Sequence, residues 1–69
     1  MPPLEAQSEV RQIKGMIAEL GVNQQLFIQK LVDPFMSPFE LDRHLARLEA
    51  DMRTINSRTF SLSRELEPV

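Results

Sequence analysis

The sequence predicts an all-α fold, a long hairpin of three helices over about residues 4–20, 24–33 and 38–66. Apolar residues recur every three or four positions over most of the chain, which is the period of a helix. Residues that start and stop helices separate these apolar stretches. The chain has 69 residues, 42% of them hydrophobic and 26% charged, which is typical of a folded protein. We therefore expect a single helical domain over residues 1–69, with flexible ends at 1–3 and 67–69.

The first helix is predicted from a stripe of apolar residues between positions 4 and 20. Val10, Ile13, Ile17 and Leu20 follow one another at steps of three, four and three. Gly21 comes directly after the stripe, where a helix often ends in a left-handed residue, as in a Schellman motif. The sequence therefore predicts that this helix stops before Gly21.

The second helix is predicted over residues 24–33, with Asn23 as its N-cap. Pro34 ends it, since the residue before a proline is disfavoured in a helix. Its apolar residues are Leu26, Phe27, Ile28, Leu31 and Val32. Because they spread too widely around the helix for one neighbour to cover, we expect this helix to contact two neighbours.

The third helix has the clearest starting signal in the chain. Ser37 is placed as the N-cap, Pro38 occupies the first helical position, and Glu40 stands three residues after the cap. Met36 and Leu41 have the spacing of a hydrophobic staple across this start. We therefore expect a helix to begin at residue 38.

A heptad pattern follows and continues almost to the end of the chain. Steps of four and three alternate through Leu41, Leu45, Leu48, Met52, Ile55, Thr59, Leu62 and Leu66. This is the pattern of a coiled-coil seam or of a helix in a bundle. Serine, threonine and asparagine are frequent between positions 54 and 63, and they are weak helix formers. Residues 56–66 are thus predicted as helix, with a frayed or extended tail as the alternative.

The helix lengths indicate how the elements pack. The third helix would be about 40 Å long, and the first two end to end would have the same length. We therefore expect the first two helices to pack antiparallel to the third. Two layers of helix leave one side uncovered, so we expect a partner or a second copy to complete a bundle.

Composition and motifs favour a non-enzymatic interaction module over an enzyme. The chain lacks the known phosphate-loop, dinucleotide, nucleophile-elbow and zinc motifs, and it has no cysteine. His44 and Glu40 lie one turn apart without a third ligand, so we expect an ion pair and no metal, cofactor or catalytic site. The net charge of −2 disfavours nucleic acid. No run is apolar enough to span a membrane, and we expect a cytoplasmic protein.

The expected partner is another protein chain, either a second copy or a different helical protein, in a dimer or hetero-complex. The chain would act as an adaptor, small chaperone or assembly subunit. The loop with Phe35, Met36 and Phe39 would either dock a partner or plug the end of the hairpin, and Phe60 lies off the heptad stripe. The candidate contact residues are Ile13, Ile17, Phe27, Leu31, Phe35, Met36, Leu45, Leu48, Met52, Ile55 and Phe60.

Residues 17–27 also resemble the helix-turn-helix of DNA-binding regulators, with a Gly-Val turn and a capped second helix. This resemblance implies, as an alternative, a transcriptional regulator or its cofactor that uses residues 17–31. Ile17 departs from the family pattern, which has a small residue there, and Lys30 is the only base on the second helix. In size, acidity and expected layout the chain is similar to the small co-chaperones of type III secretion needle subunits. A structural homo-oligomer is a further alternative.

Overall fold

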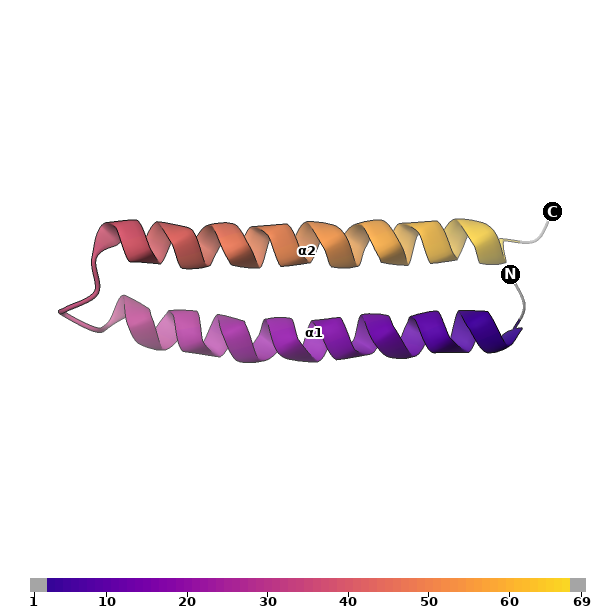
Figure 1. The fold of residues 1–69 in the computed structure, drawn as a ribbon, viewed down its shortest axis with the longest axis horizontal. Coiled ribbons are helices and arrows are strands. Elements are labelled where there is room, and N and C mark those ends of the chain that lie inside the picture. Colours follow the sequence, from indigo (N-terminus) through magenta and orange to yellow (C-terminus); the bar gives the residue numbers. More distant parts are fainter. Residues whose placement is uncertain (1–2, 68–69) are drawn as a thin grey trace.

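The computed structural model describes residues 3–67 and consists there of two antiparallel α-helices without a strand. Helix α1 spans Pro3–Leu31 and helix α2 spans Pro38–Leu66, and each has 29 residues. The two helices lie side by side in a slender hairpin with Cα extents of 54 × 16 × 12 Å (Figure 1). The start of α1 and the end of α2 lie together, opposite the connecting loop.

The prediction of three helices was wrong, because the first two form one continuous helix through Gly21. No glycine in residues 3–67 has a positive φ, so Gly21 does not adopt the left-handed conformation of a helix stop. A glycine inside a helix costs only about 1 kcal/mol relative to alanine. Before Gly21, residues spaced by seven on α1, namely Ala6, Ile13 and Leu20, pack with Ile55 and Leu62 of α2. After Gly21, Phe27 lines a groove together with Leu48 of α2. This packing continues the helix past a residue that would end an isolated one.

The loop between the helices begins slightly earlier than expected. Helix α1 ends at Leu31, and the amide of Asp33 donates to the carbonyl of Lys30 at 3.2 Å in a tight last turn. One carboxylate oxygen of Asp33 accepts a hydrogen bond from the amide of Phe35 at 2.9 Å. This side-chain turn around Pro34 reverses the direction of the chain.

The predicted start of α2 is confirmed. The hydroxyl oxygen of Ser37 accepts a hydrogen bond from the amide of Glu40 at 3.1 Å, and Pro38 is the first helical residue. Ser37 itself has the extended backbone of an N-cap. The local sequence was sufficient here because the cap satisfies its hydrogen bond within four residues.

The second half of α2 is helical to Leu66, so the extended tail is excluded. The hydroxyls of Thr54 and Thr59 donate to the carbonyls of Ala50 and Ile55, at 3.1 and 2.8 Å. These bonds stay within the helix, so the polar residues do not compete with it.

The predicted flexible ends are described only in part. Pro3 is the first residue of α1, so it belongs to a helix, and Glu67 follows α2 as its C-cap. Residues 1, 2, 68 and 69 lie outside the described part of the chain.

The core is a single line of contacts, which we call the seam. Its residues recur every seven positions on each helix, and those with the lowest exposure are Ala6, Ile13, Leu48, Ile55 and Leu62. Met16 and Leu20 pack against them. Only half of the predicted heptad stripe of α2 therefore faces α1. The other half, which includes Leu45 and Met52, lies beside the seam and stays exposed.

Candidate helix-docking surface

One side of the seam carries all the hydrogen bonds that join the two helices within residues 3–67, and we call it the polar side. The guanidinium of Arg58 donates to both carboxylate oxygens of Glu9, at 2.8 and 3.0 Å. It also donates to the amide oxygen of Gln12 at 2.8 Å and to the sulfur of Met16 at 3.2 Å. The bond from Arg58, helped by its charge, holds the pKa of Glu9 below its ordinary value against the opposing effect of desolvation.

Glu9 and Arg58 each stand three positions after a seam residue, as do the other residues of the polar side. Those on α1 are Glu9, Met16, Asn23 and Lys30, and those on α2 are His44, Asp51, Arg58 and Glu65. Shallow grooves run along this side, one of them between Asn23 and His44 and another between Glu9 and Glu65. Arg58 bridges the two helices on this side, through its bonds to Glu9 and Gln12.

The opposite side is apolar, and we call it the apolar side. Its residues stand four positions after a seam residue, which turns them to the other edge of each helix. Because the helices are antiparallel and both right-handed, these edges lie on the same side of the hairpin. The apolar side consists of Val10, Ile17 and Leu31 on α1 and Leu45, Met52 and Leu66 on α2, with Gln24 and Thr59 between them.

The apolar side is more exposed than the polar side, which is the reverse of what the polarity of their residues would predict. Ile17 is 51% exposed, Leu45 42% and Met52 44%. The charged side chains of Glu9 and Arg58, at equivalent positions across the seam, are only 25% and 35% exposed. An isolated two-helix protein would gain more free energy from covering its apolar side chains than its charged ones. This hairpin leaves its more hydrophobic side open.

The structure divides the predicted contact residues into groups. Ile13, Leu48 and Ile55 are buried in the seam, so the hairpin itself occupies them. Phe27 and Met36 are half-buried. The apolar side contains the predicted Ile17, Leu31, Leu45 and Met52. It also contains Val10 and Leu66, which the prediction omitted although their spacing of seven from Ile17 and Thr59 is visible in the sequence.

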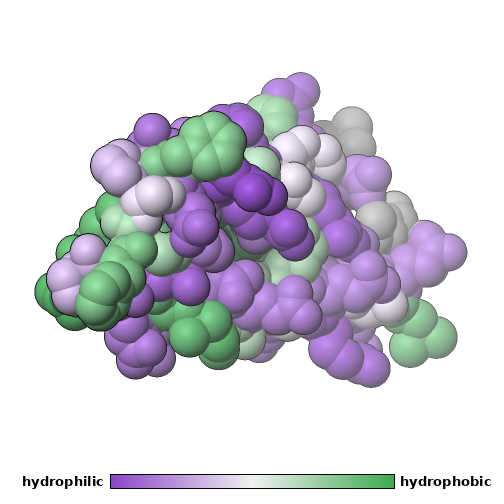
Figure 2. All heavy atoms as spheres, turned by 60° about the vertical axis from the view of Figure 1, so that its left-hand side comes forward, coloured by the Kyte–Doolittle hydropathy of each residue, from purple (hydrophilic) through white to green (hydrophobic). Residues whose placement is uncertain are grey.

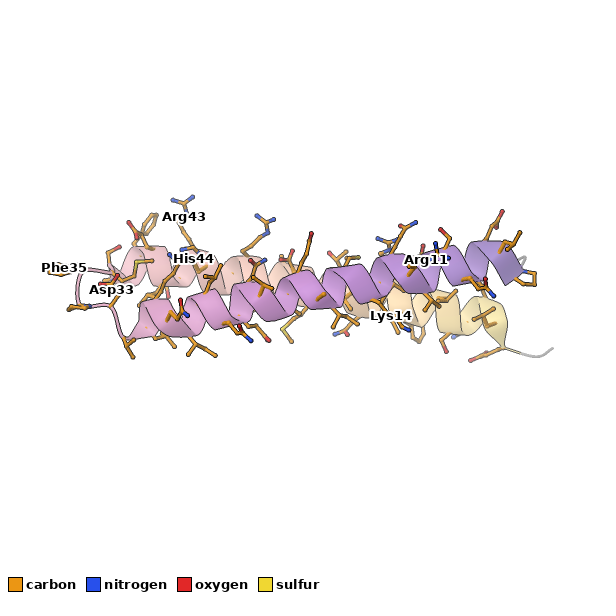
Figure 3. All side chains as sticks on the ribbon, turned by 90° about the horizontal axis from the view of Figure 1, so that it is seen from below. Arg11, Lys14, Asp33, Phe35, Arg43 and His44 are labelled. Carbon is orange, nitrogen blue, oxygen red and sulfur yellow. The ribbon has the colours of Figure 1, made fainter. Side chains whose placement is uncertain are left out.

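A second group of exposed apolar residues lies at the loop. Phe35 is 94% exposed and Phe39 71%, so these two phenylalanines do not plug the end of the hairpin. Phe35 projects beyond the ends of both helices (Figure 3). When the loop end is turned forward, hydrophobic atoms gather there beside largely hydrophilic helix surfaces (Figure 2). This loop surface is small, and it is separate from the middle of the apolar side.

Phe60 is 63% exposed, with the guanidinium carbon of Arg64 at 5.6 Å from its ring centre. The expected ion pair between His44 and Glu40 is not formed; Arg47 instead pairs with Asp51 at 3.5 Å. Within residues 3–67, no three metal-binding side chains gather, and neither helix is long and apolar enough to cross a membrane. The turn expected at residues 21–23 is helical, so residues 17–31 contain no helix-turn-helix.

The hairpin exposes more surface than a compact protein of its mass. Its accessible surface is 5695 Å² for 8.0 kDa. A folded monomer of that mass exposes about 4,500 Å². The difference, on the order of 1,000 Å², is similar to the ~800 Å² that each partner buries in a standard protein interface.

Comparison of the chain with protein-family models, with curated proteins and with solved structures found no match.

Proposed function

We propose that this chain is a non-enzymatic protein–protein interaction module whose apolar side packs against helices of another protein chain. The observation that carries the proposal is the inverted burial of the two sides. Ile17, Leu45 and Met52 stay open while Glu9 and Arg58 are half-buried. Covering the open side chains would contribute about 25 cal/mol per Å² of apolar surface, which is a strong drive toward a partner.

The shape of the apolar side favours a helical partner. Its residues form two rows with a repeat of seven residues, one over residues 10–31 of α1 and one over residues 45–66 of α2. Together the two rows cover almost the full length of the hairpin. Such rows offer holes into which the side chains of another helix can insert. Two helices packed on these rows would complete a four-helix bundle. An adaptor, a small chaperone and an assembly subunit would all use such a surface.

The experiment is site-specific photocrosslinking in the cells that produce the protein. A benzophenone amino acid is introduced at position 17 on the apolar side and, in a matched variant, at position 22. Val22 is also apolar and is 59% exposed, but it lies on the outer surface of α1. We expect protein adducts from position 17 and few from position 22. Equal yields at the two positions, or no adduct from position 17, would contradict the proposal.

A further inference from the structure

We propose that the chain which covers the apolar side is a second copy of this hairpin, packed so that α1 of each copy lies against α2 of the other. This inference rests on the proposed function and names the partner for the same surface. Its grounds are the area of that surface, the symmetry available to two hairpins and the charges that border it.

The area of the apolar side fits a dimer of two identical hairpins. The apolar side extends along a body whose Cα extents are 54 × 16 Å in its two longest directions. One hairpin thus offers a face on the order of 800 Å², which matches the share of each partner in a standard interface. A second hairpin has the same length and the same two rows. It therefore covers the whole face, and the apolar side of neither chain stays exposed.

Symmetry leaves two ways to pair the faces. A twofold axis parallel to the long axis places α1 on α2 of the second copy, with both loops at the same end. A twofold axis across the hairpin places α1 on α1 and α2 on α2, with the loops at opposite ends. All neighbouring helices are antiparallel in both arrangements, so the side chains must decide between them.

Charges next to the apolar side favour the first arrangement. The residues one position after the seam border this side and would face the neighbouring copy. On α1 the charged residue among them is Lys14. On α2 the charged residues among them are Asp42 and Glu49. Just outside the border, Arg11 on α1 and Arg53 on α2 occupy equivalent positions and do not distinguish the helices.

With Ile13 level with Ile55, packing α1 on α2 brings Lys14 within about 8 Å, along the axis, of Glu49 on the other copy. Asp42 lies further along the axis, toward the loop. Packing like helices together would pair border charges of one sign only.

The heights of the apolar residues, meaning their positions along the long axis of the hairpin, agree with this arrangement. Ile13 and Ile55 belong to the same core cluster. Ile17 lies one turn after Ile13, and Met52 lies one turn before Ile55, so the antiparallel helices bring Ile17 and Met52 to nearly the same height. An axis parallel to the hairpin preserves height. Ile17 of one copy therefore meets Met52 of the other near the middle of the bundle.

The first measurement is the mass of the purified chain by sedimentation equilibrium across a range of concentrations. We expect a dimer of twice 8.0 kDa that dissociates on dilution. Ile17→Asp should shift the midpoint concentration at least tenfold upward while circular dichroism shows that it remains helical. The matched Val22→Asp should leave the midpoint unchanged. A helical wild-type chain that stays monomeric at high micromolar concentration would overturn the inference.

The second measurement tests the arrangement without destabilising the fold. The chain has no cysteine, so Ile17→Cys and Met52→Cys each introduce a single thiol. Isotopically heavy Ile17→Cys is mixed with light Met52→Cys and treated with a short bis-maleimide. Heavy–light products in excess of like–like products support the packing of α1 on α2. Products only between like variants would overturn it.

These results also separate the inference from the proposed function. If the purified chain is monomeric but position 17 still gives adducts in cells, a different protein covers the apolar side and only the second copy is excluded. If position 17 gives no adduct, the proposed function fails as well.

Discussion

At the scale of single residues, Glu9 links the stability of the hairpin to pH. Its carboxylate accepts two bonds from Arg58, which lower its pKa from the ordinary value of 4.5 in the folded chain. A lowered folded pKa means that the unfolded chain binds more protons as the solution becomes acidic. The stabilisation is therefore present above about pH 4.5 and is lost as the pH falls through the folded pKa.

The corresponding prediction concerns Glu9→Gln. The variant should melt at a lower temperature than the wild type at pH 7, and this difference should shrink as the pH is lowered to 3. Thermal unfolding followed by circular dichroism at matched protein concentrations measures both. Glu19→Gln is the control, because Glu19 is an exposed carboxylate of the same helix. If the two variants had the same effect, the bond to Arg58 would not stabilise the hairpin.

At the scale of the elements, Gly21 distinguishes one helix from two. A Cβ at Gly21 would meet nothing within 4 Å, and its φ is not positive. Gly21→Ala should therefore stabilise the chain by about 1 kcal/mol, as expected inside a helix. Urea unfolding measures the change. Gly15→Ala is a matched control with the same open space and the same expected gain. A destabilising Gly21→Ala beside a stabilising Gly15→Ala would restore the turn that the local sequence indicates.

The helix ends show which signals the sequence contains. The start of α2 was predictable because Ser37 and Glu40 bond to each other directly. The continuity of α1 was not, because it depends on contacts with residues far along the chain, such as Ile55. The seam of α1 is also hard to recognise in the sequence, since it begins with the small Ala6 and is bordered by the charged Glu9. In the sequence-based prediction, the local stop signal at Gly21 therefore outweighed the seven-residue repeat of α1. That repeat becomes clear only when α2 is seen packed against it.

The candidate surface was predictable as a set of residues but not as a side of the molecule. A heptad stripe has two apolar rows, and the sequence does not say which row a single neighbour covers. The structure shows that Leu48 and Ile55 are covered while Leu45 and Met52 are open. This rotation of the helices also places Arg58 of α2 within 2.8 Å of Glu9 of α1 on the polar side.

At the scale of the whole molecule, the seam and the apolar side should respond differently to protein concentration. Leu48 is 6% exposed within one hairpin, so Leu48→Ala should cost about 2–5 kcal/mol at any concentration. Leu45 is 42% exposed and would be covered only in the assembled form. Leu45→Ala should therefore lower the melting temperature where the wild type is associated and change it little where the wild type is monomeric.

Melting curves of the two variants and the wild type, recorded at a low and a high concentration, measure this difference. Leu48 and Leu45 lose the same atoms on substitution by alanine and lie one turn apart on α2, so each controls for the other. Equal losses for Leu45→Ala at both concentrations would mean that its own hairpin covers Leu45 in solution. The apolar side would then be covered by its own hairpin, and the free-energy gain expected from binding a partner would disappear. A loss confined to the higher concentration would show that the hairpin is one half of a larger core.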